Sequence, residues 1–351
     1  MNKTLLIIGD PLNSLNVPTD SSLAMAQGAL SLGIEVHWTT PERIALFNGV
    51  PVLSSWTQLH EIKNGCSPVS SISRCQHFES LANYTHILIR KDPPFDTDYT
   101  DLCWILSQCR PGQVINDPRA LLCLHEKLMP WRLLSRGIVP AHMMVPTMVS
   151  ITKSTILEFA REQFASAESF LKTFANLPEF RNFRFKLICK PWRGHAGRGI
   201  QVFESQQAIE EWLNNESDHV TSSEVLTAHW IVQPLLPEIF SRGDRRVFII
   251  NGEVFFDFVR RPASGRIEAN LAQGGSATLE PMPTELKDVC QQLAHYLKQE
   301  GVLIAGLDFI GLKLTEVNIT SPTGIRTYES LTGQELTKNI METLLNPLSH
   351  A

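Results

Sequence analysis

The chain has 351 residues, of which 43% are hydrophobic and 19% charged, and its formal net charge is −5. This composition is typical of a globular protein with two or three domains. The acidic balance excludes a broad basic surface, so we expect no nucleic-acid partner. The apolar run Leu5 to Ile8 is too short for a signal peptide, and no segment approaches the roughly 20 apolar residues of a membrane span. We therefore expect a cytoplasmic protein with no membrane partner.

The seven cysteines are odd in number and include no Cys-x-x-Cys spacing. This pattern indicates neither a disulfide framework nor a zinc site. We expect reduced thiols that are mainly buried.

The first third of the chain predicts a parallel sheet. Residues 3–9 form an apolar strand, Ser21 to Leu32 an amphipathic helix, and Glu35 to Trp38 a second strand. Two further strands are predicted at His86 to Arg90 and Gln113 to Asn116. The fold class is therefore α/β in this part of the chain.

Arg90 and Lys91 stand where a predicted strand ends, and open α/β sheets bind ligands at such ends. They could hold an anionic substrate. The prolines at 93 and 94 equally favour a simple chain break with solvated charges.

The middle of the chain predicts two helices and a glycine-rich hairpin. The helices are Leu121 to Arg136 and Ser154 to Phe174. Strands at 185–191 and 200–203 flank the turn Trp192 to Gly199, whose backbone amides could cradle phosphates. It is not a Walker motif, because a strand follows it, and such a loop is usually only a turn. Lys190, beside the loop, favours phosphate binding.

The last part of the chain is α+β in pattern. It predicts a helix over Gln207 to Asn214, a strand from Trp230 to Pro237, and a second long helix over Thr284 to Gln299. Asn251-Gly252 predicts a tight hairpin between strands 245–250 and 253–260.

In a regular hairpin of this length, Arg246 faces Asp257, as a cross-strand ion pair or as part of an anion site. Arg260, Arg261 and Arg266 follow closely, before a glycine pair, and this favours carboxylate or phosphate capture.

Two short apolar strands between Gly306 and Ile319 carry matched polar residues. A hairpin centred on Leu312 pairs Asp308 with Glu316, at roughly 5 Å between Cβ atoms, and like charges so placed call for a cation. Asn318 lies on the same face as Glu316. These hard oxygen ligands suit Mg2+ better than zinc. The alternative is that Asp308 caps a turn and Asn318 lies in a loop.

Taken together, these residues resemble the prokaryotic-type glutathione synthetases of the ATP-grasp superfamily. The matching motifs extend over nearly the whole chain: 9–11, 20–22, RKDPPFD at 90–96, 116–118, 126–128, 190–191, 243–247, 270–275, 306–308 and EVNITSPTGIR at 316–326. The resemblance implies an ATP-grasp fold with an N-terminal parallel-sheet domain, and a ligase that joins glycine to γ-glutamylcysteine. The implied domains are 1–120 for substrate binding, 121–204 as the central lid, and 205–351 with the metal site.

The resemblance also implies roles for individual residues. Arg246 and Arg260 would stabilise the acyl phosphate, and Asp308, Glu316 and Asn318 would bind Mg2+ or Mn2+. ATP would contact Lys127, Lys190, Gly194, Gly197, Gly199, Gln233, Pro234, Leu235, Leu236, Asp244 and Asn318. The small-molecule substrates, a γ-glutamylcysteine-like peptide and a glycine-like amine, would contact Asp20, Ser21, Arg90, Asn270, Ser321, Pro322 and Thr323. We also expect a homo-oligomer.

Two departures leave alternatives open. The family loop is usually Asp-Gly-Met-Gly-Gly, whereas this chain has Arg193-Gly194-His195-Ala196-Gly197. Glu268 stands where the family has an arginine two residues before Asn270. The alternatives are a related ligase with another amine or peptide acceptor, and an ATP-binding protein without catalysis.

Overall fold

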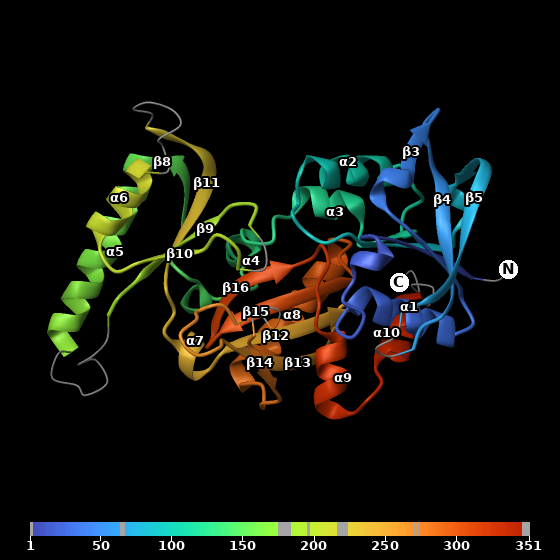
Figure 1. Cartoon of the computed structure of the whole chain (residues 1–351). Helices are drawn as coiled ribbons and strands as arrows, with labels where there is room; N and C mark the ends of the chain where they lie inside the picture. Colours follow the sequence, from blue (N-terminus) through green and yellow to red (C-terminus); the bar gives the residue numbers. More distant parts are fainter. Residues whose placement is uncertain are drawn as a thin grey trace. The chain divides into compact units, whose positions relative to one another are not determined.

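The computed structural model describes residues 3–63, 67–174, 184–194, 197–215, 224–269, 271 and 274–345. The chain divides into two compact units, Met1–Met144 with Arg242–Ala351, and Val145–Ser241. Within the described residues, no helix is both long enough and apolar enough to cross a membrane. Figure 1 labels the helices and strands.

A seven-stranded sheet forms the N-terminal part of the first unit, in the order β3-β4-β2-β1-β6-β7 with β5 paired to β4. The four strands β1, β2, β6 and β7 are parallel, which confirms the predicted parallel sheet. The bounds are β1 Thr4–Gly9, α1 Ser21–Ser31, β2 Glu35–Thr39, β3 Ile44–Phe47, β4 Val50–Glu61, β5 Val69–Ser80, β6 His86–Arg90, α2 Thr97–Leu106, β7 Val114–Ile115, α3 Pro118–Cys123 and α4 Met129–Ser135.

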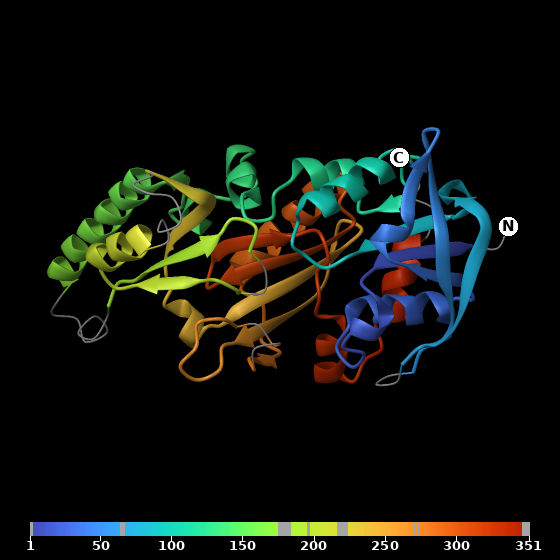
Figure 2. The same cartoon turned by 45° about the horizontal axis from the view of Figure 1, so that its top comes forward.

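The hairpin β4–β5 was not expected from the sequence. Its two strands of 12 residues extend the sheet beyond β2 (Figure 2). Short 3-10 helices at Leu12–Ser14, Pro41–Arg43, Leu81–Asn83 and Ala141–Met143 complete this part.

The single helix expected from Leu121 to Arg136 is instead two helices, so that prediction is wrong. α3 ends at Cys123 and α4 begins at Met129, with a turn over 124–128 between them. Pro130 lies in the first turn of α4, where its missing N–H costs nothing, whereas within one continuous helix it would remove a hydrogen bond. The turn presents the side chains of Glu126 and Lys127.

A five-stranded sheet of order β14-β13-β12-β15-β16 forms the C-terminal part of the same unit. Its strands are antiparallel neighbours, and α8 covers β12 and β13. The bounds are β12 Asp244–Ile250, β13 Glu253–Arg261, β14 Ser276–Thr278, α8 Thr284–Gln299, β15 Ile304–Ile310, β16 Lys313–Asn318, α9 Ile325–Thr332 and α10 Thr337–Leu345.

The hairpin β12–β13 forms as predicted, but its register differs, and the expected pairing of Arg246 with Asp257 is wrong. A bulge between Phe248 and Ile249 shifts the pairing by one residue, so Arg246 faces Phe258. A one-residue shift moves a side chain to the other face of a sheet. Asp257 therefore forms its ion pair with Arg245, and Arg246 points the other way.

The two halves of the first unit pack directly on each other. Helices α1 and α10 lie side by side (Figure 1), and a methyl group at Gly28 of α1 would overlap the backbone of Thr337. One core cluster joins residues of β1, β2 and α1 to residues of β12, β13 and α10. Residues more than 200 positions apart are therefore held in one body.

The second unit is a four-stranded sheet of order β10-β9-β11-β8 with two helices on one face. Helices α5 and α6 pack side by side, as Figure 1 shows. The expected boundary at residue 204 falls inside this unit, because β9 and β11 on either side of it are paired. The bounds are β8 Met148–Thr152, α5 Lys153–Phe174, β9 Leu187–Pro191, β10 Gln201–Phe203, α6 Gln206–Asn215, β11 Val225–Pro234 and α7 Glu238–Ser241.

Candidate active site

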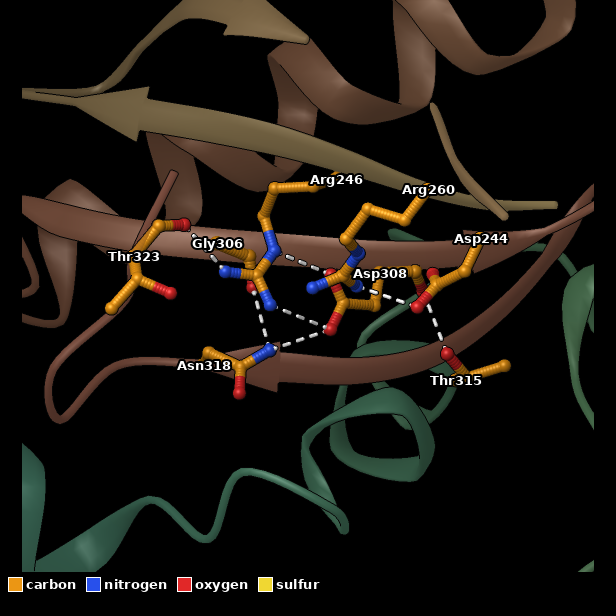
Figure 3. Close-up of polar contacts among 8 residues, drawn as sticks. All are labelled: Asp244, Arg246, Arg260, Gly306, Asp308, Thr315, Asn318 and Thr323. Carbon is orange, nitrogen blue, oxygen red and sulfur yellow. Dashed lines mark hydrogen bonds and ion pairs between the residues drawn. The ribbon is translucent and has the colours of Figure 1, made fainter. Parts of the chain in front are cut away.

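Asp308 lies at the centre of a buried cluster of charged side chains in the first unit (Figure 3). Arg246 donates to both of its oxygens, from Nε to Oδ1 at 2.6 Å and from Nη2 to Oδ2 at 3.0 Å. Arg260 Nη2 lies 2.9 Å from Oδ1 and 2.5 Å from Asp244 Oδ2. We call Asp244, Arg246, Arg260 and Asp308 the charge cluster.

Strand register explains why these four side chains meet. Arg246 of β12 is directly opposite Asp308 of β15, and Asp244 of β12 is directly opposite Arg260 of β13. Residues two apart on a strand point to the same face. The four side chains therefore share one face of the five-stranded sheet, across three adjacent strands.

Burial and neighbouring charges have opposite effects on the pKa values of the carboxyl groups in the charge cluster. The side chains of Arg246 and Asp308 are only 7% and 8% exposed. Burial opposes ionisation of Asp308, but the guanidiniums of Arg246 and Arg260 lower the pKa of its carboxyl. Burial raises the pKa of Asp244 to about 6 in spite of Arg260 beside it. Arg260 Nε is buried and has no hydrogen-bond partner in the described part of the chain.

The predicted oxygen ligands lie next to the charge cluster. Asp308 and Glu316 are directly paired across β15 and β16, as expected from the sequence. Asn318 faces Gly306, and its Nδ2 donates to Asp308 Oδ2 at 2.9 Å. In Figure 3 the Asn318 oxygen points away from Asp308. The guanidiniums of Arg246 and Arg260 therefore supply part of the positive charge that the Asp308–Glu316 carboxylate pair requires.

The donor set fits a divalent metal ion with a preference for oxygen. Two carboxylates and one amide on adjacent strands are the hard ligands that such ions take. Among the described residues, no three His, Cys, Asp or Glu side chains lie together as a metal site. A metal ion here would therefore take its third side-chain ligand from the Asn318 amide and further ligands from a substrate.

Lys127 reaches the same region from the turn between α3 and α4. Burial lowers the pKa of its ammonium, and the carboxylates of Glu316 and Glu126 oppose that shift. Lys127 is thus brought near the metal-ligand candidates, although it lies far from them in the sequence.

Three of the predicted substrate residues belong to the segment 319–325, and two more contact its backbone. Arg90 is 2% exposed and donates to Ser22 Oγ at 2.9 Å and to the Pro322 carbonyl at 3.1 Å. The interpretation of Arg90 as a solvated charge is therefore wrong. Burial lowers the pKa of Arg90, against the effect of nearby Asp20 and Asp92.

Other predicted site residues also form hydrogen bonds to backbone groups. Ser21 Oγ accepts from the amides of Gly324 and Ile325, and Arg246 donates to the Thr323 carbonyl at 2.9 Å. Asp20 caps α1 by accepting from Leu23. Ser321 is 8% exposed. Asn270 lies outside the described residues.

In the second unit, the predicted nucleotide residues form their own group. Lys190 Nζ donates to Gln233 Oε1 at 3.0 Å, and Gln233 Nε2 donates to Thr147 Oγ1 at 2.9 Å. Pro234 ends β11, and Leu235 and Leu236 follow it, with the Leu235 amide bonded to the Lys186 carbonyl. The chain exit from β11 is thereby fixed next to Lys190.

The glycine-rich turn packs on the end of β9. Gly197 and Gly199 both have φ of 74°, a conformation that favours glycine. A Cβ atom at Gly199 would lie 2.9 Å from Pro191 Cγ, and Gly194 donates to the Pro191 carbonyl at 3.1 Å. The described part of the turn therefore requires glycine at 199, on conformational and steric grounds.

Comparison with solved structures defines the class of protein. The chain superposes on D-cycloserine synthetase with a TM-score of 0.63 at 13% identity, over 97% of this chain and 98% of that one. An ATP-grasp protein of the RimK domain type from Sphaerobacter thermophilus DSM 20745 gives a TM-score of 0.55 at 14% identity, over 97% and 99% of the two chains. These likenesses establish the ATP-grasp fold.

Sequence comparison is more specific. Residues 4–121 match the family described as "Prokaryotic glutathione synthetase, N-terminal domain" and residues 153–333 the one described as "Prokaryotic glutathione synthetase, ATP-grasp domain". A glutathione synthetase of Prochlorococcus marinus (strain MIT 9313) is 31% identical, over 97% of this chain and 98% of that protein. One from Vibrio vulnificus (strain CMCP6) is 30% identical, over 96% of both. The chain belongs to the prokaryotic glutathione synthetase family, and it is a ligase that uses ATP and a divalent metal.

Two further residues, which the sequence marks only as members of motifs, make prominent contacts. Asn116 makes four hydrogen bonds to the backbone of Leu303, Ile304 and Ile319, and Glu126 makes three to Ile319 and Thr320. Their partners lie about 190 residues away, so no local pattern indicated these roles.

Proposed function

We propose that this ligase joins γ-glutamylcysteine and glycine to give glutathione, ADP and phosphate, with Mg2+ as the metal. The observation that carries the proposal is the charge cluster. Two guanidiniums are held rigidly on one buried face beside a carboxylate pair, and such fixed charges stabilise a phosphoryl group in transfer.

In this proposal the cysteinyl carboxylate of the peptide attacks the γ-phosphorus of ATP, and ADP leaves. The amine of glycine then attacks the acyl phosphate, loses a proton, and phosphate departs. Arg260 and Arg246 supply positive charge to the phosphoryl oxygens and to the attacked carbonyl. The buried Arg260 Nε, which lacks a protein partner among the described residues, supports this role, because buried donors are normally paired.

The remaining assignments divide by unit. In the first unit, Asp308, Glu316 and Asn318 would hold Mg2+, and Lys127 and Asp244 would contact ATP. A bound divalent ion would neutralise phosphate charge as a Lewis acid. In the second unit, Lys190, the glycine turn at 194–199 and the segment 233–236 would contact the nucleotide. Lys190 is positioned for this by its bond to Gln233.

The substrate peptide would lie against the segment 321–323, with Asp20, Ser21, Arg90 and Asn270. Ser21 and Arg90 would act there mainly through the backbone they fix, since both side chains are almost fully buried. Because ATP is the co-substrate, we place the reaction in the cytoplasm. A homo-oligomer stays a prediction, which light scattering would test.

A related ligase with a different acceptor amine is the second candidate, and Glu268 favours it. A carboxylate there would repel the carboxylates of the peptide or attract a second amine. An ADP-release assay with γ-glutamylcysteine against a panel of amines separates the two. Preference for glycine supports glutathione synthesis, and preference for another amine supports the second candidate. No ADP release with any amine would refute both.

A further inference from the structure

Glu126 makes an unusual set of contacts with the segment that follows β16. Its Oε1 accepts from the amide of Ile319 at 2.7 Å, from the amide of Thr320 at 2.9 Å and from Thr320 Oγ1 at 2.9 Å. Its own carbonyl accepts from the amide of Val317 at 3.2 Å. One residue of the turn 124–128 is thus bound to the chain on both sides of Asn318.

These contacts fix two successive peptide units. The N–H of Ile319 belongs to the same planar group as the carbonyl of Asn318, and the N–H of Thr320 to the same group as the carbonyl of Ile319. That second carbonyl also accepts from Asn116 Nδ2 at 2.7 Å. With both planes held, the backbone that carries the Asn318 side chain has little freedom to turn.

Glu126 is also the neighbour of Lys127 in the same short turn, outside any helix. Movement of the carboxylate would therefore displace the Lys127 ammonium and the Asn318 amide together. Ordinary anchoring of a turn would need only one of these hydrogen bonds, and it would not connect the two predicted ligand groups.

We infer that Glu126 is a positioning residue, which sets Lys127 and Asn318 in one geometry for the metal-bound nucleotide. The inference rests on the proposed function only for the ligand, a nucleoside diphosphate or triphosphate with a divalent ion. Glu126 acts through the reach of its carboxylate oxygen to two backbone amides, and its charge is secondary.

The chain contains a matched control in Glu329. Its Oε1 accepts from the amides of Leu336 and Thr337, at 3.0 and 3.1 Å, and from the Thr337 hydroxyl. The contacts of Oε1 are of the same kind as at Glu126, two consecutive amides and a threonine hydroxyl, and both glutamates are half-buried. Glu329 differs in one respect, because its Oε2 also pairs with Arg326 at 2.9 Å. Glu329 joins α9 to α10 and contacts none of the predicted ligand residues in the described part of the chain.

The experiment measures ADP binding by calorimetry, with MgCl2 and with EDTA, for Glu126→Asp, Glu126→Gln, Glu329→Asp and the parent. Aspartate keeps the charge but is one methylene too short, whereas glutamine keeps an acceptor oxygen at the same reach. We expect Glu126→Asp to weaken Mg2+-dependent ADP binding about 10- to 100-fold, as loss of groups that orient metal ligands does. Glu126→Gln and Glu329→Asp should keep the affinity of the parent.

Thermal melting separates positioning from stability, because both aspartate variants should lower the melting temperature but only Glu126→Asp should weaken ADP binding. The inference is overturned if Glu126→Asp binds ADP as the parent does, if Glu329→Asp weakens binding equally, or if Glu126→Gln weakens it as much as aspartate. The assay contains no peptide or amine, so failure of glutathione synthesis would leave this result intact. A parent that does not bind ADP would overturn both proposals.

Discussion

Replacing Asp308 with asparagine should destabilise the first unit strongly. The carboxylate accepts three hydrogen bonds from Arg246 and Arg260 and one from Asn318, so both of its oxygens are paired with these side chains. The variant leaves two guanidiniums, 7% and 13% exposed, with Asp244 as the remaining carboxylate of the charge cluster. It also turns an amide N–H toward an arginine N–H.

Removing one partner of a buried ion pair costs about 3–5 kcal/mol. With a urea dependence of about 2–3 kcal/mol per molar, the unfolding midpoint should fall by about 1–2.5 M. Urea titration in EDTA without nucleotide, followed by circular dichroism, measures this shift free of any metal effect.

Asp288→Asn is the control, because Asp288 is exposed on α8 and its loss should cost no more than about 0.5 kcal/mol. If Asp308→Asn shifts the midpoint no more than this control does, the charge cluster does not stabilise the fold as described. A shift in slope without a shift in midpoint would count against the reasoning in the same way.

Three further outcomes follow from the packing and the hydrogen bonds. Asn116→Ala should lower the free energy of unfolding by about 3 kcal/mol or more, because it removes the partner of four buried or partly buried backbone groups, and an unchanged urea midpoint would contradict this. Gly28→Ala should cost about 1–3 kcal/mol by forcing α10 away from α1, which a melting curve would detect and a neutral result would disprove. Burial raises the pKa of Cys189 and Cys290 to about 12, so at pH 8 iodoacetamide should label the exposed Cys123 and spare these two thiols until denaturant is added. Peptide mass spectrometry measures the labelling, and prompt labelling of Cys189 or Cys290 in the native chain would contradict their burial.

The sequence alone predicted contacts between residues that are close in the sequence better than contacts between distant residues. Asp308 and Glu316 are eight residues apart in one hairpin, and the structure confirms their pairing. The expected centre at Leu312 is wrong, because Ile310 pairs with Lys313 and a bulge between Asp308 and Phe309 then brings Asp308 opposite Glu316. The bulge in β12–β13 inserts one residue without a sequence signal, and it reversed the face of Arg246. A local pattern therefore gave the carboxylate pair but not its guanidinium partners.

Contacts between distant segments were outside the reach of pattern reasoning. The hydrogen bonds of Glu126 span 191 to 194 residues. The break at 124–128 that exposes this residue also runs against a helical pattern that looked continuous. Motif resemblance marked these positions, but only the folded backbone gives their physical roles.

Isotope transfer tests the central claim, ligation through an acyl phosphate, most directly. γ-Glutamylcysteine labelled with 18O in its cysteinyl carboxylate would be incubated with ATP, Mg2+ and glycine, and the phosphate analysed by mass spectrometry. We predict glutathione together with phosphate that carries one 18O atom from the carboxylate, because the amine displaces that oxygen with the phosphoryl group. Unlabelled phosphate, or ATP hydrolysis without glutathione, would contradict the account.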